Sequence, residues 1–163
     1  MSKRNIALTI AVTALTFLVL LIGSKFYEVY APQNPLEKEL VKYHIKNLQY
    51  NRQEKIVVLF VQKDTDLRAA LNDIFKKIGT VDVEVHDNPS QKLKTFYNNE
   101  ELYIMQYIAK KEYGTLKDFL EKKAIANQFT VYMTIDDHYL YLKIVDGSQV
   151  LYKLYPRAEE SGV

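Results

Sequence analysis

KIVVLFVQ, the stretch at residues 55–62, is a continuous run of β-branched, aliphatic and aromatic residues. A strand with apolar residues on both faces is usually central in its sheet and covered on both sides. We therefore expect this stretch to form the central strand of the fold.

A helix and a second strand are predicted directly after this run. Asp64 and Thr65 are typical helix-capping residues, and apolar residues then recur at helical spacing over residues 67–78. Gly79 is placed to end that helix. Residues 81–85 alternate strictly between apolar and acidic side chains, as in a half-buried strand. This strand–helix–strand order predicts a right-handed parallel crossover.

Helices are predicted on both sides of this unit. The apolar stripe of residues 36–51 predicts one helix before it. After the break at Asn88-Pro89-Ser90, we expect two helices, at 91–97 and 100–112. A third is expected from Thr115, where the sequence resembles a capping box, to about Ala126.

The last third of the chain is predicted to be an antiparallel meander. Residues 129–135, 139–145 and 149–155 read as strands, and Asp146-Gly147 is a strong hairpin signal. The predicted fold class is thus α/β (mixed α+β), with a mixed sheet of about five strands in one small domain. The strand order is similar to a thioredoxin-like topology, and the opening helix and closing strands are similar to GAF or PAS sensory modules; neither similarity has a motif behind it.

A charge-free run, IALTIAVTALTFLVLLIG at residues 6–23, precedes the domain. As a helix, eighteen residues rise about 27 Å, close to the hydrocarbon thickness of a bilayer. We expect a single-pass transmembrane helix. The chain then divides into a cytoplasmic stub and membrane helix (1–24), a juxtamembrane linker (25–35), an extracytoplasmic domain (36–156) and a tail (157–163).

Two other interpretations of this run are a cleaved signal peptide and a buried helix of a soluble core. A cleaved signal peptide normally has a shorter apolar region, and the nearest small-x-small site, Val29-Tyr30-Ala31, is followed by Pro32. A buried helix of a soluble core rarely remains free of charge over such a length. Lys3 and Arg4 precede the run, so the positive-inside rule predicts a cytoplasmic N-terminus with the domain outside the cytoplasm, in the periplasm or at the cell surface.

Composition restricts the function classes further. Only two of the 22 basic residues, Lys3 and Arg4, precede the run, whereas all 20 acidic residues follow it, so the outer part is formally neutral. This balance gives no support for nucleic-acid binding. The chain has no cysteine, no glycine-rich phosphate loop and no G-x-S-x-G nucleophile motif. We therefore expect no cofactor and no enzymatic activity.

Several histidine and aspartate residues are candidate site residues, but a structural role is favoured for each of them. His44 is expected on a helix, and His86-Asp87 at the end of a strand. Asp136-Asp137-His138 could hold a metal ion, but aspartate is also a favoured turn residue. Asp64-Thr65-Asp66 follow the central strand, where ligands often bind, but helix capping explains them equally well.

Tyrosine provides the strongest functional hint outside the membrane. Tyr139 and Tyr141 alternate with leucines, so a tyrosine-rich face is exposed if the leucines point into the core. Tyrosine is enriched at protein interfaces. The possible interaction face comprises Tyr132, Tyr139, Tyr141, Lys143, Tyr152 and Lys153. Ordinary strand propensity in a partly buried sheet is the alternative.

Small residues one turn apart in the apolar run predict helix pairing in the membrane. Ala7 and Ala11 allow close approach, and Thr9 and Thr13 can hydrogen-bond across helices. The expected partners are therefore the lipid bilayer and either a second copy of the chain or another envelope protein. A plain anchor is the alternative.

These observations favour a membrane-anchored protein whose extracytoplasmic domain mediates protein–protein interaction in assembling or regulating an envelope complex. The first alternative is a small-molecule sensor or a holin-like lysis regulator with a globular outer domain. Because only residues 1–5 precede the run, lateral association is favoured over signalling. A metal-dependent enzyme that uses Asp136, Asp137 and His138 is the remaining alternative.

Overall fold

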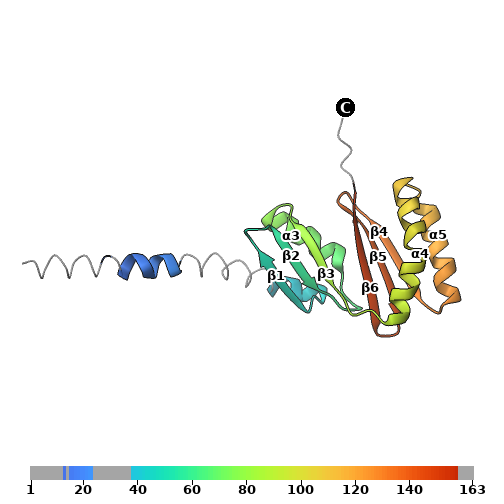
Figure 1. Cartoon of the computed structure of the whole chain (residues 1–163), viewed down its shortest axis with the longest axis horizontal. Helices are drawn as coiled ribbons and strands as arrows, with labels where there is room; N and C mark the ends of the chain where they lie inside the picture. The colour runs from blue at the N-terminus through green and yellow to red at the C-terminus, as the bar shows by residue number, and fades with distance from the viewer. Residues whose placement is uncertain (1–12, 14, 24–37, 158–163) are drawn as a thin grey trace, which may run out of the picture.

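The computed structural model describes residues 13, 15–23 and 38–157 (Figure 1). The predicted linker at 25–35, the tail beyond Arg157, and Ala7, Thr9 and Ala11 lie outside the described residues. The domain begins with a short helical segment at residues 38–40. The elements that follow are η1 Val41–Tyr43, β1 Asn47–Asn51, β2 Ile56–Phe60, α3 Leu67–Ile78, β3 Asp82–His86, α4 Gln91–Ala109, α5 Tyr113–Ala126, β4 Thr130–Ile135, β5 Tyr139–Asp146 and β6 Gln149–Pro156.

The strands form two three-stranded sheets, so the expectation of one five-stranded sheet is wrong. In the first sheet, β1 pairs antiparallel and β3 parallel with β2. In the second, β4, β5 and β6 form the expected antiparallel meander. The sheets meet at an isolated bridge between Asn88 and Val150, just beyond the end of β3. The mixed α+β class is confirmed.

The first sheet gains its third strand from a segment that was expected to be helical. Residues 38–40 are helical and continue into η1, but His44 then adopts a left-handed conformation (φ 57°) that ends the turn. In β1, Leu48 is buried while its neighbours Asn47 and Gln49 are exposed. This alternation has a period of two, and it outweighs the weaker helical stripe of the same segment.

Two other helix boundaries differ from expectation. The separate helices at 91–97 and 100–112 are one helix, α4, because its buried side chains continue across Asn98 and Asn99 at spacings of three and four. The helix α5 begins at Tyr113, before the resemblance to a capping box at Thr115. By contrast, α3 has the predicted bounds, and Gly79 ends it with a φ of +79° that favours glycine.

The stretch at 55–62 forms the middle strand of its sheet, but only one of its faces is in the core. Val57 and Leu59 are completely buried against α3. Ile56, Val58 and Phe60 on the other face are half-buried and do not belong to either hydrophobic cluster. The expected coverage on both sides is therefore wrong.

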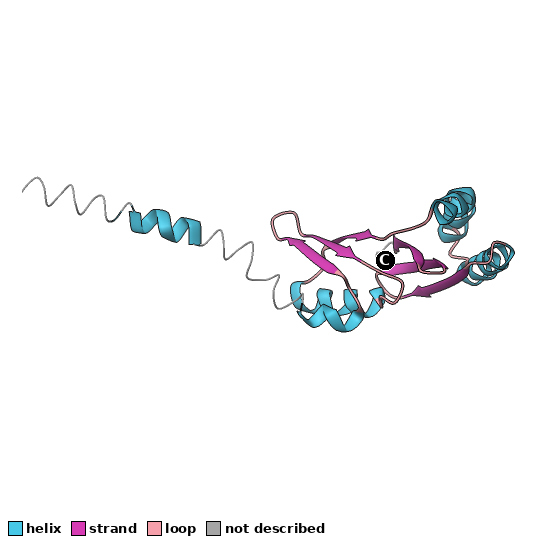
Figure 2. Cartoon of the chain, turned by 90° about the horizontal axis from the view of Figure 1, so that it is seen from below, coloured by secondary structure: helices cyan, strands magenta, loops and turns pink. Residues whose placement is uncertain are grey.

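The strand β5, by contrast, is covered on both sides. Its Leu140, Leu142 and Ile144 pack with α4 and α5, while Tyr141 and Val145 point into the core shared with α3 and the first sheet. Figures 1 and 2 show this order: α4 and α5 lie on one side of the second sheet, and α3 with the first sheet on the other. The second sheet is the middle layer of the molecule.

At the N-terminal end, residues 15–23 are helical. Their large apolar side chains are 52–65% exposed, from Leu15 to Ile22. In the part of the chain that the structure describes, no helix reaches the length and apolarity that a membrane crossing requires.

Candidate functional site

The predicted tyrosine face of the second sheet is largely internal. Tyr141 and Tyr152 are each only 6% exposed, so the expectation that they are accessible for binding is wrong. The face is covered because α3 and the turn between β2 and α3 pack against it. These two tyrosines therefore join the two sheets in this chain.

Tyr152 also joins the two sheets through hydrogen bonds. Its hydroxyl donates to the carbonyl oxygen of Thr65 at 2.8 Å, and its backbone N–H donates to Asp87 Oδ2 at 2.6 Å. Burial raises the pKa of the Tyr152 phenol, and nearby carboxylates, first Asp66, raise it further. The phenol therefore remains a neutral donor at physiological pH.

Tyr141 faces the turn between β4 and β5. Burial raises its pKa, and the nearby Asp136 carboxylate raises it further. Burial opposes ionisation of Asp136 itself, but the N–H groups of Tyr139 and His138, the Tyr141 hydroxyl and Arg68 together hold its pKa below the usual range. Arg68 Nε lies 3.7 Å from Asp136 Oδ2, so α3 reaches this turn.

The remaining members of the predicted face lie on different sides of the sheet. Lys143 Nζ is 5.4 Å from the ring centroids of both Tyr132 and Tyr152. Burial lowers its pKa, although the carboxylates of Asp64 and Asp66 act in the opposite direction. Lys153 points to the other side, where its Nζ lies 4.7 Å from the centroid of the Tyr97 ring.

Tyr132 is the exposed member of the set, with 55% of its surface accessible. Tyr139 is half-buried against Phe75 of α3, with the ring centroids 6.1 Å apart. The six predicted residues therefore do not form one continuous accessible surface.

The aspartates and histidines take the structural roles that were preferred for them. Asp136 Oδ1 accepts the N–H groups of His138 and Tyr139, both at 2.9 Å, as in a capped turn. His86 packs against Phe60 and lies 3.8 Å from Glu84. Among the described residues, no three histidine, aspartate or glutamate side chains are grouped closely enough to hold a metal ion.

The residues after β2 cap α3. Asp66 accepts the N–H of Ala69 at 3.1 Å and is the N-cap. The buried Thr65 hydroxyl accepts the N–H of Gln62 and donates to the carbonyl oxygen of His44. The capping interpretation is confirmed for Asp66, whereas Asp64 is exposed.

Exposed apolar residues that sequence reasoning did not identify lie on the outer helices. The exposed large apolar residues of α4 and α5 are Leu102, Tyr103, Met105 and Ile125. Leu102 and Ile125 are 78% and 75% exposed, and Leu102 and Met105 lie one turn apart on the same side of α4. The signal was present in the sequence, because α4 carries apolar residues beyond those that one buried stripe requires.

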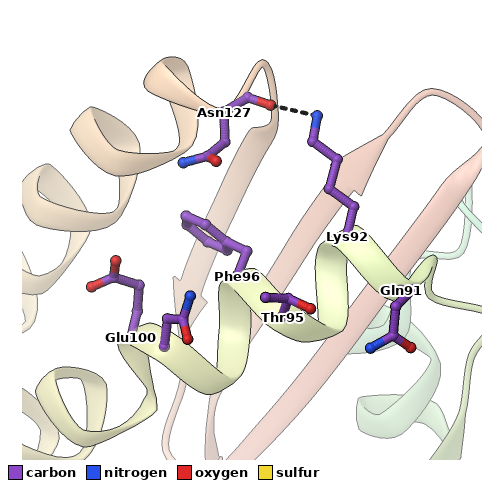
Figure 3. A pocket seen from close by; sticks show the side chains of 7 residues that line it. Gln91, Lys92, Thr95, Phe96, Glu100 and Asn127 are labelled. Atoms are coloured by element: carbon purple, nitrogen blue, oxygen red, sulfur yellow. Dashed lines mark hydrogen bonds between the residues drawn. The ribbon is translucent and has the colours of Figure 1, made fainter.

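A hollow of about 370 Å³ opens between α4 and the end of α5 (Figure 3). Lys92 Nζ reaches across it to the carbonyl oxygen of Asn127 at 3.0 Å and lies over the ring of Phe129. Glu100 Oε1 lies 3.1 Å from Lys123 Nζ, while its buried Oε2 has no hydrogen-bond partner within the described residues. Lys92 and one carboxylate oxygen of Glu100 are therefore already bound within the chain.

Comparison with known proteins identifies no relative. No protein-family model matches the sequence, and searches of curated proteins and of solved structures gave no significant match.

Proposed function

We propose that this chain is a single-pass membrane protein with a cytoplasmic N-terminus, whose extracytoplasmic domain binds another protein and thereby assembles or regulates an envelope complex. The observation that carries the proposal is the helix at residues 15–23. It lies in a charge-free run, and its large side chains are exposed to solvent. Such a helix is stable where lipid or another protein covers it.

The exposed apolar residues of α4 and α5 support the binding part of the proposal. These are Leu102, Tyr103, Met105 and Ile125, and they lie on the opposite side of the second sheet from the first sheet. Solitary exposed apolar residues are common, but several on two packed helices favour an interaction surface. This surface replaces the tyrosine face as the proposed contact region.

Membrane anchoring is tested by extracting membranes with alkaline carbonate. We expect the full chain to remain in the membrane pellet, and a variant that lacks residues 6–23 to be released. External protease should digest the domain in intact spheroplasts. Release of the full chain by carbonate, or protection from external protease, would contradict the proposal. The mass of the membrane-bound chain separates an anchor from a cleaved signal.

Site-specific photo-crosslinking in cells tests the binding surface. A photoreactive amino acid placed at Leu102 or Ile125 should give a cross-linked product of defined size. The matched control is Gln53, an exposed polar position in the turn between β1 and β2. Equal cross-linking at all three positions, or none at Leu102 and Ile125, would be evidence against this surface.

A further inference from the structure

A second hollow lies on the other side of α4, between that helix and β6. Its volume is about 300 Å³, and its lining includes Lys94, Tyr97 and Asn98 of α4 and Leu151 and Lys153 of β6. The two lysines come from different elements, so the fold itself brings their charges to one place.

The charges in this hollow are not balanced within the chain. Across the described residues, neither Lys94 nor Lys153 forms an ion pair; Lys153 Nζ lies over the Tyr97 ring instead. The carboxylate that lines the hollow is Asp87, and its Oδ2 already accepts the backbone N–H of Tyr152. Two lysine ammonium groups and one aspartate carboxylate therefore give the lining of the hollow a net charge of about +1.

The hollow on the α5 side of the same helix makes the contrast clear. There, Lys92 donates to the Asn127 carbonyl (Figure 3), and Lys123 pairs with Glu100. Both ammonium groups have oxygen partners. The lysines on the α5 side of α4 therefore have oxygen partners within the chain, whereas no oxygen of the described residues pairs with Lys94 or Lys153 on the β6 side.

The walls of the β6-side hollow are held in place. Tyr97 and Leu151 are buried. The Tyr97 hydroxyl lies 2.9 Å from the hydroxyl of Tyr155 and donates to Glu101, also at 2.9 Å. The Tyr97 ring, over which the Lys153 ammonium group lies, is thus held in place. Asn98 adds a side-chain amide that can donate a hydrogen bond to a ligand. A preformed site loses little entropy when it binds a ligand.

We infer that this hollow binds a phosphate group, which Lys94 and Lys153 contact from opposite sides. Lysine ammonium groups bind phosphate as point charges, and the volume leaves room for a substituent attached to the phosphorus. The phosphate belongs either to a small soluble molecule or to a lipid headgroup. The inference does not depend on the proposed anchor or on the apolar surface of α4 and α5.

Equilibrium dialysis against radiolabelled inorganic phosphate tests this site. The full chain is kept in neutral detergent, and ionic strength is held constant with chloride. We expect retention of about one phosphate per chain at millimolar phosphate, and Lys94→Gln and Lys153→Gln should each weaken binding at least about fivefold. Lys94 is exposed, so its replacement leaves folding intact even if Lys153→Gln does not.

Lys92→Gln is the matched control, because Lys92 lies on the same helix but faces the other hollow. It should leave phosphate retention unchanged. Absence of retention, or an equal loss in Lys92→Gln and Lys94→Gln, would overturn the assignment. Mixed micelles separate the two sources: competition by phosphatidic acid but not by phosphatidylcholine supports a lipid headgroup, and absence of competition with phosphate still retained supports a soluble phosphate.

Discussion

The strands β2 and β5 occupy the same position in their sheets, but their surroundings differ. Each is the middle strand of three. In β2, buried residues alternate with half-buried ones, so one face is in the core. In β5, six of the eight residues contribute to the cores on both faces: Leu140, Tyr141, Leu142, Ile144, Val145 and, half-buried, Tyr139.

The difference shows what an apolar run can and cannot indicate. The run at 55–62 is apolar on both faces, yet Val58 stands between Gln49 and Glu84 of the neighbouring strands. In β5, one of the two buried faces contains the tyrosines Tyr139 and Tyr141. From the sequence alone, a tyrosine in a strand is expected to be partly exposed. Tyrosine can be buried when its hydroxyl finds a partner. Tyr152 of the adjacent strand β6 does so by donating to the carbonyl oxygen of Thr65.

The largest expected effect comes from removing the same two methyl groups from each strand. Val145→Ala should lower the free energy of unfolding by about 2 kcal/mol, because it opens a cavity in the shared core. Val58→Ala should cost less than about 1 kcal/mol, since Val58 is only half-buried. Urea denaturation followed by circular dichroism measures both values.

The pair of valines is matched in strand propensity, so the difference between the two losses isolates burial. Equal losses would mean that β2 is also covered on its second face. A partner bound over Ile56, Val58 and Phe60 would give that result, and it would move the proposed contact region to the first sheet.

A smaller effect is expected from removing one hydroxyl. Tyr152→Phe should destabilise the fold by about 1–2 kcal/mol, because it leaves the Thr65 carbonyl without its buried donor. Tyr132→Phe is the control, and it should change stability by less than about 0.5 kcal/mol at its exposed position. If the two variants were equally stable, the two sheets would not be joined through this bond.

Local signals in the sequence predicted much of the fold. The bounds of α3, the parallel pairing of β2 with β3 and the three strands of the meander follow from spacing, caps and turn residues within short windows. The preferred turn role of Asp136 and capping role of Asp66 were predicted for the same reason.

The division into two sheets could not be predicted, because it depends on contacts between distant residues. The contact of Tyr152 with Thr65 spans 87 positions, and no local pattern indicates it. The exposure of the tyrosine face was predicted wrongly for the same reason, because whether Tyr141 is exposed depends on where α3 packs. The hollow between Lys94 and Lys153 likewise joins α4 to β6, two elements that are separated by α5, β4 and β5.

The smallest expected effect is the pH dependence of the turn between β4 and β5, where α3 meets the second sheet. Because the folded-state pKa of Asp136 lies below its ordinary value of 3.8, the unfolded chain binds more protons in mild acid. The stabilisation is therefore complete above that ordinary value and is lost as the pH falls through the lower folded-state pKa. Asp136→Asn should remove this part of the acid dependence, as measured by urea denaturation between pH 6 and about pH 3.

The asparagine side chain keeps an oxygen that can accept the N–H groups of His138 and Tyr139, so the turn itself should persist. Asp137 is the matched control, since it is exposed in the same turn. Asp137→Asn should retain the acid dependence of the unmodified chain. If both variants lost it equally, the effect would come from the net charge of the turn, and the contact between Arg68 and Asp136 would not couple α3 to the second sheet.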